Sequence, residues 1–188
     1  MRPPDHPHYS ELLEWEREFC GLLTASGQQR EALPFRADSK IFEPVIVAAE
    51  CARTPGAILV VSPPEYASSW VSAWSHCGRR GALRQQSRPT GTEAVVTTVE
   101  EIQRAKRSFQ TVEYSVILLA AGLSEQEADQ VISLLSHHYA WWMVDQAESH
   151  SWALSPAGRS LYLEHEWQSV ALEAGPRGRL SGLAVDLS

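Results

Sequence analysis

Short apolar runs recur along the middle of the chain, and each is bounded by turn residues. Residues 57–61 read Ala-Ile-Leu-Val-Val, residues 114–119 read Tyr-Ser-Val-Ile-Leu-Leu, and residues 140–144 read Ala-Trp-Trp-Met-Val. Runs of this length without polar alternation are typical of strands that are buried on both faces of a parallel sheet. The pattern therefore predicts three central strands.

Helical periodicity fills the segments between these runs. It predicts helices over residues 41–53, 65–76, 98–109 and 124–138, and an amphipathic helix from residue 11 to a stop at Gly27. Two of the helix starts carry capping boxes, Thr98 with Glu101 and Ser124 with Glu127. Residues 28–40 are predicted to be a connecting loop, and residues 81–86 to form a further strand.

The alternation of strands and helices predicts an α/β fold of three layers, in which helices flank a mainly parallel sheet on both faces. Residues 161–167 and 179–187 alternate loosely and predict antiparallel edge strands or a hairpin at the C-terminal end. The length of 188 residues fits one such domain over residues 11–188. Residues 1–10, rich in proline and histidine, are predicted to be disordered.

Charge and cysteine content restrict the class of protein. The net charge is -7, which argues against nucleic acid as a partner, although a basic stretch runs from Arg79 to Arg88. Three widely spaced cysteines without a CxxC motif indicate reduced thiols in a cytoplasmic protein. No signal peptide and no apolar run of about 20 residues is found, so no membrane association is expected.

The sequence offers no nucleotide site. A phosphate loop of the GxxxxGK[ST] type is absent, and the segment before the helix at residue 41 holds Asp38, Ser39 and Lys40 but no glycine. An NTPase would place an acidic metal ligand after the strand that ends at Leu119, where this chain has alanines and a glycine. We therefore predict that the protein is not an enzyme and binds no cofactor.

Metal and nucleophile motifs are missing as well. His137 and His138 are adjacent, and on a helix their side chains would diverge by about 100°. The other histidines show no metal-ligand spacing, and no GxSxG motif occurs. The sequence therefore predicts no catalytic residue and no metal site.

Tryptophan is unusually frequent, with seven residues. Trp70 and Trp74 fall on one stripe of the helix predicted at 65–76, and Trp74 is expected to pack on the sheet. Trp70, with Arg79 and Arg80 nearby, is expected either to join that core or to form an exposed protein interface, because tryptophan and arginine dominate interface hot spots.

Several short segments together resemble the SulA family of bacterial SOS cell-division inhibitors. The resemblance runs in order through residues 35–38, 59–63, Trp70, 98–100, 104–105, 114–117, 123–127 and 179–183. It implies a RecA-like fold that has lost nucleotide binding. It also implies a function after DNA damage: binding to the polymerisation face of FtsZ, the tubulin-like division GTPase, which blocks assembly, GTP hydrolysis and septation.

The resemblance also implies the partner-binding residues. These are Trp70 after the strand, Val61 at the end of that strand and Arg80 ten residues beyond the tryptophan, with Arg79 beside it. The basic residue that the family has before the strand falls on Gly56 here, and Arg53 is the nearest substitute.

Two further partners follow from the family comparison and from the predicted sheet. The chain ends Val-Asp-Leu-Ser and lacks the Tyr-His end that the Lon protease reads in some members, so degradation by Lon is a weaker expectation than FtsZ binding. An exposed edge strand could pair with its copy in a homodimer.

Two other functions remain open. The chain is also similar to the RecA-like accessory protein ImuA of the translesion response, which implies binding to protein partners or, through the basic stretch 79–88, to DNA. The strand-turn-Trp segment resembles a superfamily 2 helicase domain as well, which implies a degenerate half-domain that acts as a scaffold. That third hypothesis predicts a second RecA-like lobe encoded elsewhere.

Overall fold

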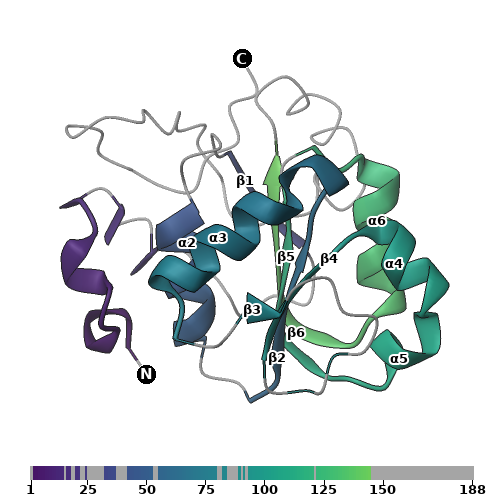
Figure 1. The fold of residues 1–188 in the computed structure, drawn as a ribbon, viewed down its shortest axis with the longest axis horizontal. Coiled ribbons are helices and arrows are strands. Elements are labelled where there is room, and N and C mark those ends of the chain that lie inside the picture. Colours follow the sequence, from purple (N-terminus) through teal and green to yellow (C-terminus); the bar gives the residue numbers. More distant parts are fainter. Residues whose placement is uncertain are drawn as a thin grey trace.

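The strands among the described residues form a six-stranded sheet in which every pair is parallel (Figure 1). The computed structural model describes residues 2–14, 16–17, 20–21, 24, 32–36, 42–52, 55–79, 82–83, 89, 91, 93–120 and 122–144. The strand order is β1-β6-β5-β2-β4-β3. The strands are β1 (Ala32–Arg36), β2 (Ala57–Val61), β3 (Ala82–Leu83), β4 (Ala94–Thr97), β5 (Tyr114–Leu119) and β6 (His137–Val144).

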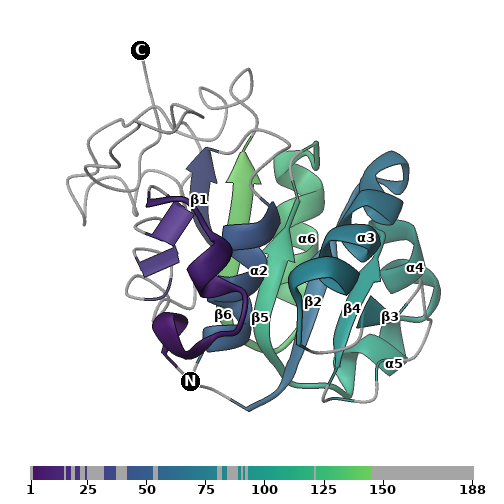
Figure 2. The same ribbon diagram turned by 60° about the vertical axis from the view of Figure 1, so that its left-hand side comes forward.

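Helices cover both faces of this sheet, which confirms the predicted three-layer α/β fold (Figures 1 and 2). On one face lie α2 (Phe42–Cys51) and α3 (Ala67–Cys77), the latter preceded by the 3₁₀ turn η3 (Pro64–Tyr66). On the other lie α4 (Val99–Arg104), α5 (Lys106–Gln110) and α6 (Glu125–Leu134). The described residues form two apolar core clusters, one on each side of the sheet.

The apolar runs became the most deeply buried strands. Every residue of β2 and β5 is buried, and their neighbours on the sheet are strands on both sides. The predicted helix starts are also confirmed, because the hydroxyls of Thr98 and Ser124 accept hydrogen bonds from the backbone N–H groups of Glu101 and Glu127. Strand burial and helix capping were therefore readable from local sequence.

Edge and short elements differ from the predictions. The segment 28–40, which was predicted to be a loop, contains the strand β1. The sequence of β1 does not predict a strand because it includes a proline and an arginine. A proline is tolerated in β1 because this strand lies at the edge of the described sheet. The four-residue β4 was not predicted, and the helix expected at 98–109 is divided at Ala105 into α4 and α5. The last helix ends at Leu134, so His137 and His138 begin β6 instead of lying on a helix.

The N-terminal segment is ordered, and the prediction of disorder over residues 1–10 is wrong for the described residues 2–10. Two short 3₁₀ turns, η1 (Pro3–Asp5) and η2 (Tyr9–Glu11), place the segment beside α2, where Figure 2 shows it in purple. His6 and His8 are buried there. All the described residues between 14 and 24 are helical, in agreement with the amphipathic helix predicted for this region.

The described residues do not test the remaining predictions about the architecture. The antiparallel strands predicted at 161–167 and 179–187 lie outside the described residues. In the described sheet the edges are β1 and β3, so edge-to-edge pairing into a homodimer stays a prediction. Among the described helices, none has the length and apolar content needed to cross a membrane.

Candidate functional site

The carboxyl ends of β2 and β5 mark the place where a sheet of this kind usually binds a ligand. The two strands are neighbours, yet the chain leaves β2 for α3 on one face and leaves β5 for α6 on the other. Such a reversal opens a crevice beyond the strand ends, and ligands of doubly wound sheets bind there. The residues that follow these two strands therefore define the candidate site.

Apolar side chains occupy this position. Gly122 follows β5 with a φ of +95°, and a Cβ added to it would lie 3.1 Å from Pro63 Cγ and 3.8 Å from Tyr66 Cε2. The proline and tyrosine that follow β2 therefore lie directly over Gly122. Pro63 is buried, and the tyrosine is 48% exposed. At the switch between β2 and β5, the described side chains of Pro63 and Tyr66 thus lie close to Gly122.

The polar groups at these strand ends are used within the fold. The backbone N–H of Ala120 donates to the carbonyl of Val61 at 2.9 Å, and the N–H of Ser62 donates to the carbonyl of Thr97 at 2.9 Å. The buried Ser62 hydroxyl donates to the carbonyl of Pro63 at 3.0 Å. Among the described residues at these two strand ends, the polar groups named above therefore already have partners within the fold, and the position after β5 holds Ala120.

The structure places Trp70 in the core, which is one of the two positions that the sequence left open for it. The indole is only 1% exposed and stands edge-on to the ring of Phe42, with ring centroids 4.4 Å apart. Val61 is fully buried in β2. Both residues are therefore part of the core, because the helix stripe that carries Trp70 and Trp74 packs against α2 and the sheet. Neither side chain is accessible to a partner in this conformation.

The predicted basic residues are only partly described. Arg79 lies just after α3 and is exposed. Arg80 and Arg53 lie outside the described residues. The structure therefore does not bring the five predicted partner-binding residues together on one surface: two are in the core and one is on the surface.

A buried carboxylate was missed by sequence reasoning. The side chain of Glu50, on α2, is 2% exposed and accepts hydrogen bonds from His6 Nε2 at 2.9 Å and Trp74 Nε1 at 3.2 Å. The backbone N–H of Arg79 donates to both of its oxygens, at 2.9 and 2.8 Å. This network, which we call the Glu50 network, joins the N-terminal segment, α2 and the end of α3.

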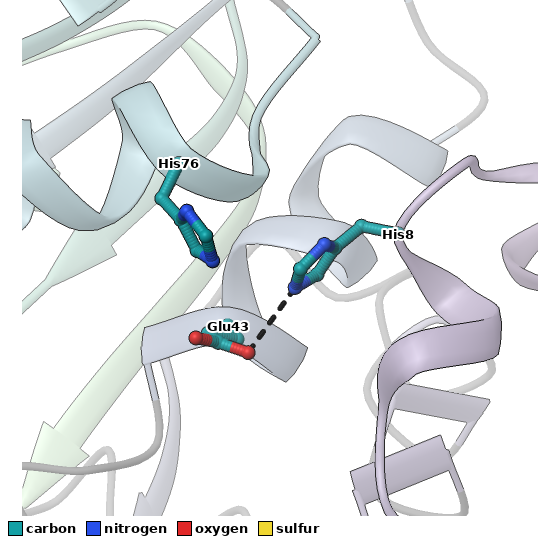
Figure 3. Close-up of side chains that lie close together, drawn as sticks. All are labelled: His8, Glu43 and His76. Atoms are coloured by element: carbon teal, nitrogen blue, oxygen red, sulfur yellow. Dashed lines mark hydrogen bonds and ion pairs between the residues drawn. The ribbon is translucent and has the colours of Figure 1, made fainter.

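One group of described side chains has the donor set of a metal site. One ligand atom from each of His8, Glu43 and His76 lies within 4.8 Å of the others, and Figure 3 shows the three side chains pointing toward a common space. No cysteine belongs to a comparable group among the described residues. Burial raises the pKa of Cys20 and Cys77 to about 12 and that of Cys51 to about 11, so these thiols are protonated at neutral pH.

Comparison of the chain with models of known protein families and with curated proteins found no match.

Proposed function

We propose that this protein is a non-catalytic RecA-like domain of the helicase type that acts as a scaffold and binds a second RecA-like lobe on another chain. The observation that carries the proposal is the carboxyl edge of the sheet, where Pro63 and Tyr66 cover Gly122. In a hydrolytic domain this edge holds the nucleotide. Here it carries an apolar and partly exposed surface suited to a protein.

The sequence before α2 supports the same proposal. Between β1 and α2 the chain holds Asp38, Ser39 and Lys40 without a glycine, so the backbone cannot form the usual phosphate cradle there. Beyond β5, Ala120 stands where the acidic metal ligand would be. Both halves of a nucleotide site are therefore altered.

Tyr66 is the residue that we assign to the contact. Among the described residues, Tyr66 and Leu13 are the two large apolar residues that are about half exposed. It lies at the carboxyl edge of the sheet, where the two lobes of a helicase-type pair would face each other. Tyrosine is enriched among interface hot spots because its ring gives a large contact area and its hydroxyl a hydrogen bond.

The burial of Trp70 favours this reading over the division inhibitor. In the SulA-type hypothesis Trp70 and Val61 contact FtsZ, whereas both are in the core here. A helicase-type strand-turn-Trp segment does not require an exposed tryptophan, since the tryptophan can pack between the helix and the sheet. The free, buried cysteines support a reducing compartment, and we place the scaffold in the cytoplasm.

The test is co-purification of the tagged full chain from its host, with Tyr66→Ala and Leu13→Ala compared. We expect a protein with a RecA-like lobe to be enriched, and Tyr66→Ala to reduce its recovery at least tenfold, about 1.4 kcal/mol. Leu13→Ala is the matched control, because it removes an equally exposed apolar side chain elsewhere. Equal recovery with both variants would contradict the assignment, and tight uptake of Mg-ATP in calorimetry would overturn the non-catalytic proposal.

A division inhibitor that binds FtsZ is the second candidate, and the exposure of Arg79 favours it. Its test is sedimentation of FtsZ polymers and GTP turnover with the full chain in excess. Arg79→Asp is the informative variant, because it reverses the charge of the exposed side chain. Both it and Arg79→Ala keep the backbone N–H that binds Glu50, and Arg79→Ala serves as the control for the fold. Trp70→Ala is unsuitable, since removing a buried tryptophan costs about 3–5 kcal/mol of stability whatever the partner.

Inhibition of FtsZ that Arg79→Asp abolishes would replace the scaffold proposal. The ImuA-like alternative predicts instead a gel shift with DNA whose affinity falls steeply with salt.

A further inference from the structure

We infer that His8, Glu43 and His76 form a binding site for Zn²⁺ that fastens the N-terminal segment to α2 and α3. The residues come from three separate parts of the fold: His8 from the turn before η2, Glu43 from the first turn of α2 and His76 from the last turn of α3 (Figure 3). This inference is independent of the proposed scaffold function.

The ligand types and their spacing fit zinc. Two imidazoles and one carboxylate are a common donor set for Zn²⁺, with metal-ligand distances of about 2.0–2.2 Å. Neighbouring ligands of a tetrahedral ion are then about 3.4 Å apart. His8 Nε2 and Glu43 Oε2 are already 3.1 Å apart, and all three ligand atoms lie within 4.8 Å. The exposed His76 needs only a small side-chain movement to complete the set.

The hydrogen-bond geometry of His8 is the second observation. Its Nδ1 lies 2.9 Å from Glu11 Oε2, while its Nε2 lies 3.1 Å from Glu43 Oε2. With the ring proton on Nδ1, the imidazole donates to Glu11 and turns the lone pair of Nε2 toward Glu43, which is the tautomer that a metal ligand requires. A cation held between Nε2 and Glu43 satisfies both contacts, because Nδ1–H then donates to Glu11. Zinc-bound histidines commonly donate their second nitrogen to a carboxylate in this way.

The Glu50 network holds His8 in position through the backbone of His8, which leaves the His8 side chain available as a ligand. The backbone N–H of His8 donates to His6 Nδ1 at 3.2 Å, and the opposite nitrogen of His6 binds the buried Glu50. This backbone contact and the orientation of the ring by Glu11 place the imidazole before any ion arrives. Such support is what a metal ligand requires for affinity.

Three protein ligands leave the fourth position of the ion to water. His76 is exposed and the side chain of Glu43 is 43% exposed, whereas that of His8 is 10% exposed. An ion at this position would therefore be reached from solvent, and it would tie residues 2–12 to the helical layer formed by α2 and α3. The expected effect of zinc is to stabilise the docking of this segment.

The experiment is calorimetric titration of the reduced full-length chain with ZnCl₂, repeated for three variants. We expect one equivalent of Zn²⁺ to bind, and His76→Ala and Glu43→Gln to weaken the affinity at least about tenfold. His138→Ala is the matched control, because His138 also faces a glutamate, Glu113 at 3.0 Å, but has no third ligand nearby among the described residues.

A second measurement guards against variants that fail to fold. Thermal unfolding with EDTA should give the same midpoint for the parent chain and His76→Ala, since His76 is exposed, while added Zn²⁺ should raise the midpoint of the parent alone. Failure of the parent chain to bind Zn²⁺, or equal binding by the parent and His76→Ala, would overturn the inference.

Discussion

Replacement of Glu50 by alanine tests whether the Glu50 network holds the N-terminal segment on the helices. The substitution removes the acceptor of two buried donors, His6 Nε2–H and Trp74 Nε1–H, and of the part-buried backbone N–H of Arg79. A buried donor without a partner costs about 1–3 kcal/mol. Since part of this cost is relieved when the N-terminal segment reaches water, we expect a total loss of about 4 kcal/mol.

Chemical denaturation in urea, with EDTA present to remove any bound ion, measures this loss. Glu43→Ala is the matched control, because it removes the same residue type from the same helix at a position whose side chain is 43% exposed. Its cost should stay below about 1 kcal/mol, as for other surface ion pairs. Glu50→Gln should be intermediate, because it keeps one acceptor oxygen but presents an NH₂ group to a donor.

A double-mutant cycle with His6→Ala separates the contact from general loss of packing. We expect a coupling energy of about 1–3 kcal/mol between positions 6 and 50, because each side chain loses most of its role when the other is absent. The reasoning would be refuted if Glu50→Ala cost no more than Glu43→Ala, or if the two substitutions were additive.

Three further outcomes follow from particular positions. Thr97→Val should stabilise the protein by about 1 kcal/mol in urea denaturation, because the buried Thr97 hydroxyl has no hydrogen-bond partner in the described structure; a loss of stability would show that it has one. Gly56→Ala should destabilise it by more than about 1 kcal/mol, because Gly56 has a φ of +138° and an added Cβ would lie 2.8 Å from the carbonyl oxygen of Glu113; an unchanged midpoint would contradict this. Burial raises the pKa of the thiols of Cys20, Cys51 and Cys77. The free energy of unfolding should therefore fall as the pH rises from about 9, because the unfolded chain then loses thiol protons that the folded chain keeps. A thiol reagent at pH 8 should modify the three cysteines only after denaturation.

The central strands and the helix starts are determined by the sequence itself. β2 and β5 are continuous apolar runs because both of their faces are covered by helices, and burial on both faces removes the need for polar alternation. Thr98 and Ser124 mark helix starts because a side-chain oxygen satisfies a backbone N–H within the same turn. Such signals act over a few residues, so local sequence is sufficient to find them.

The edge strand and the side-chain clusters were decided by tertiary structure. β1 is a strand only because β6 pairs with it, and its own residues, with a proline among them, carry no clear strand signal. The spacing of apolar residues along α3 did not show whether Trp70 is buried or exposed. Its burial depends on how α2 packs against α3. His8 and Glu43 are 35 residues apart, and His6 and Glu50 are 44 apart. Contacts over such distances depend on how the helices pack, which no local pattern of hydrophobic and polar residues specifies.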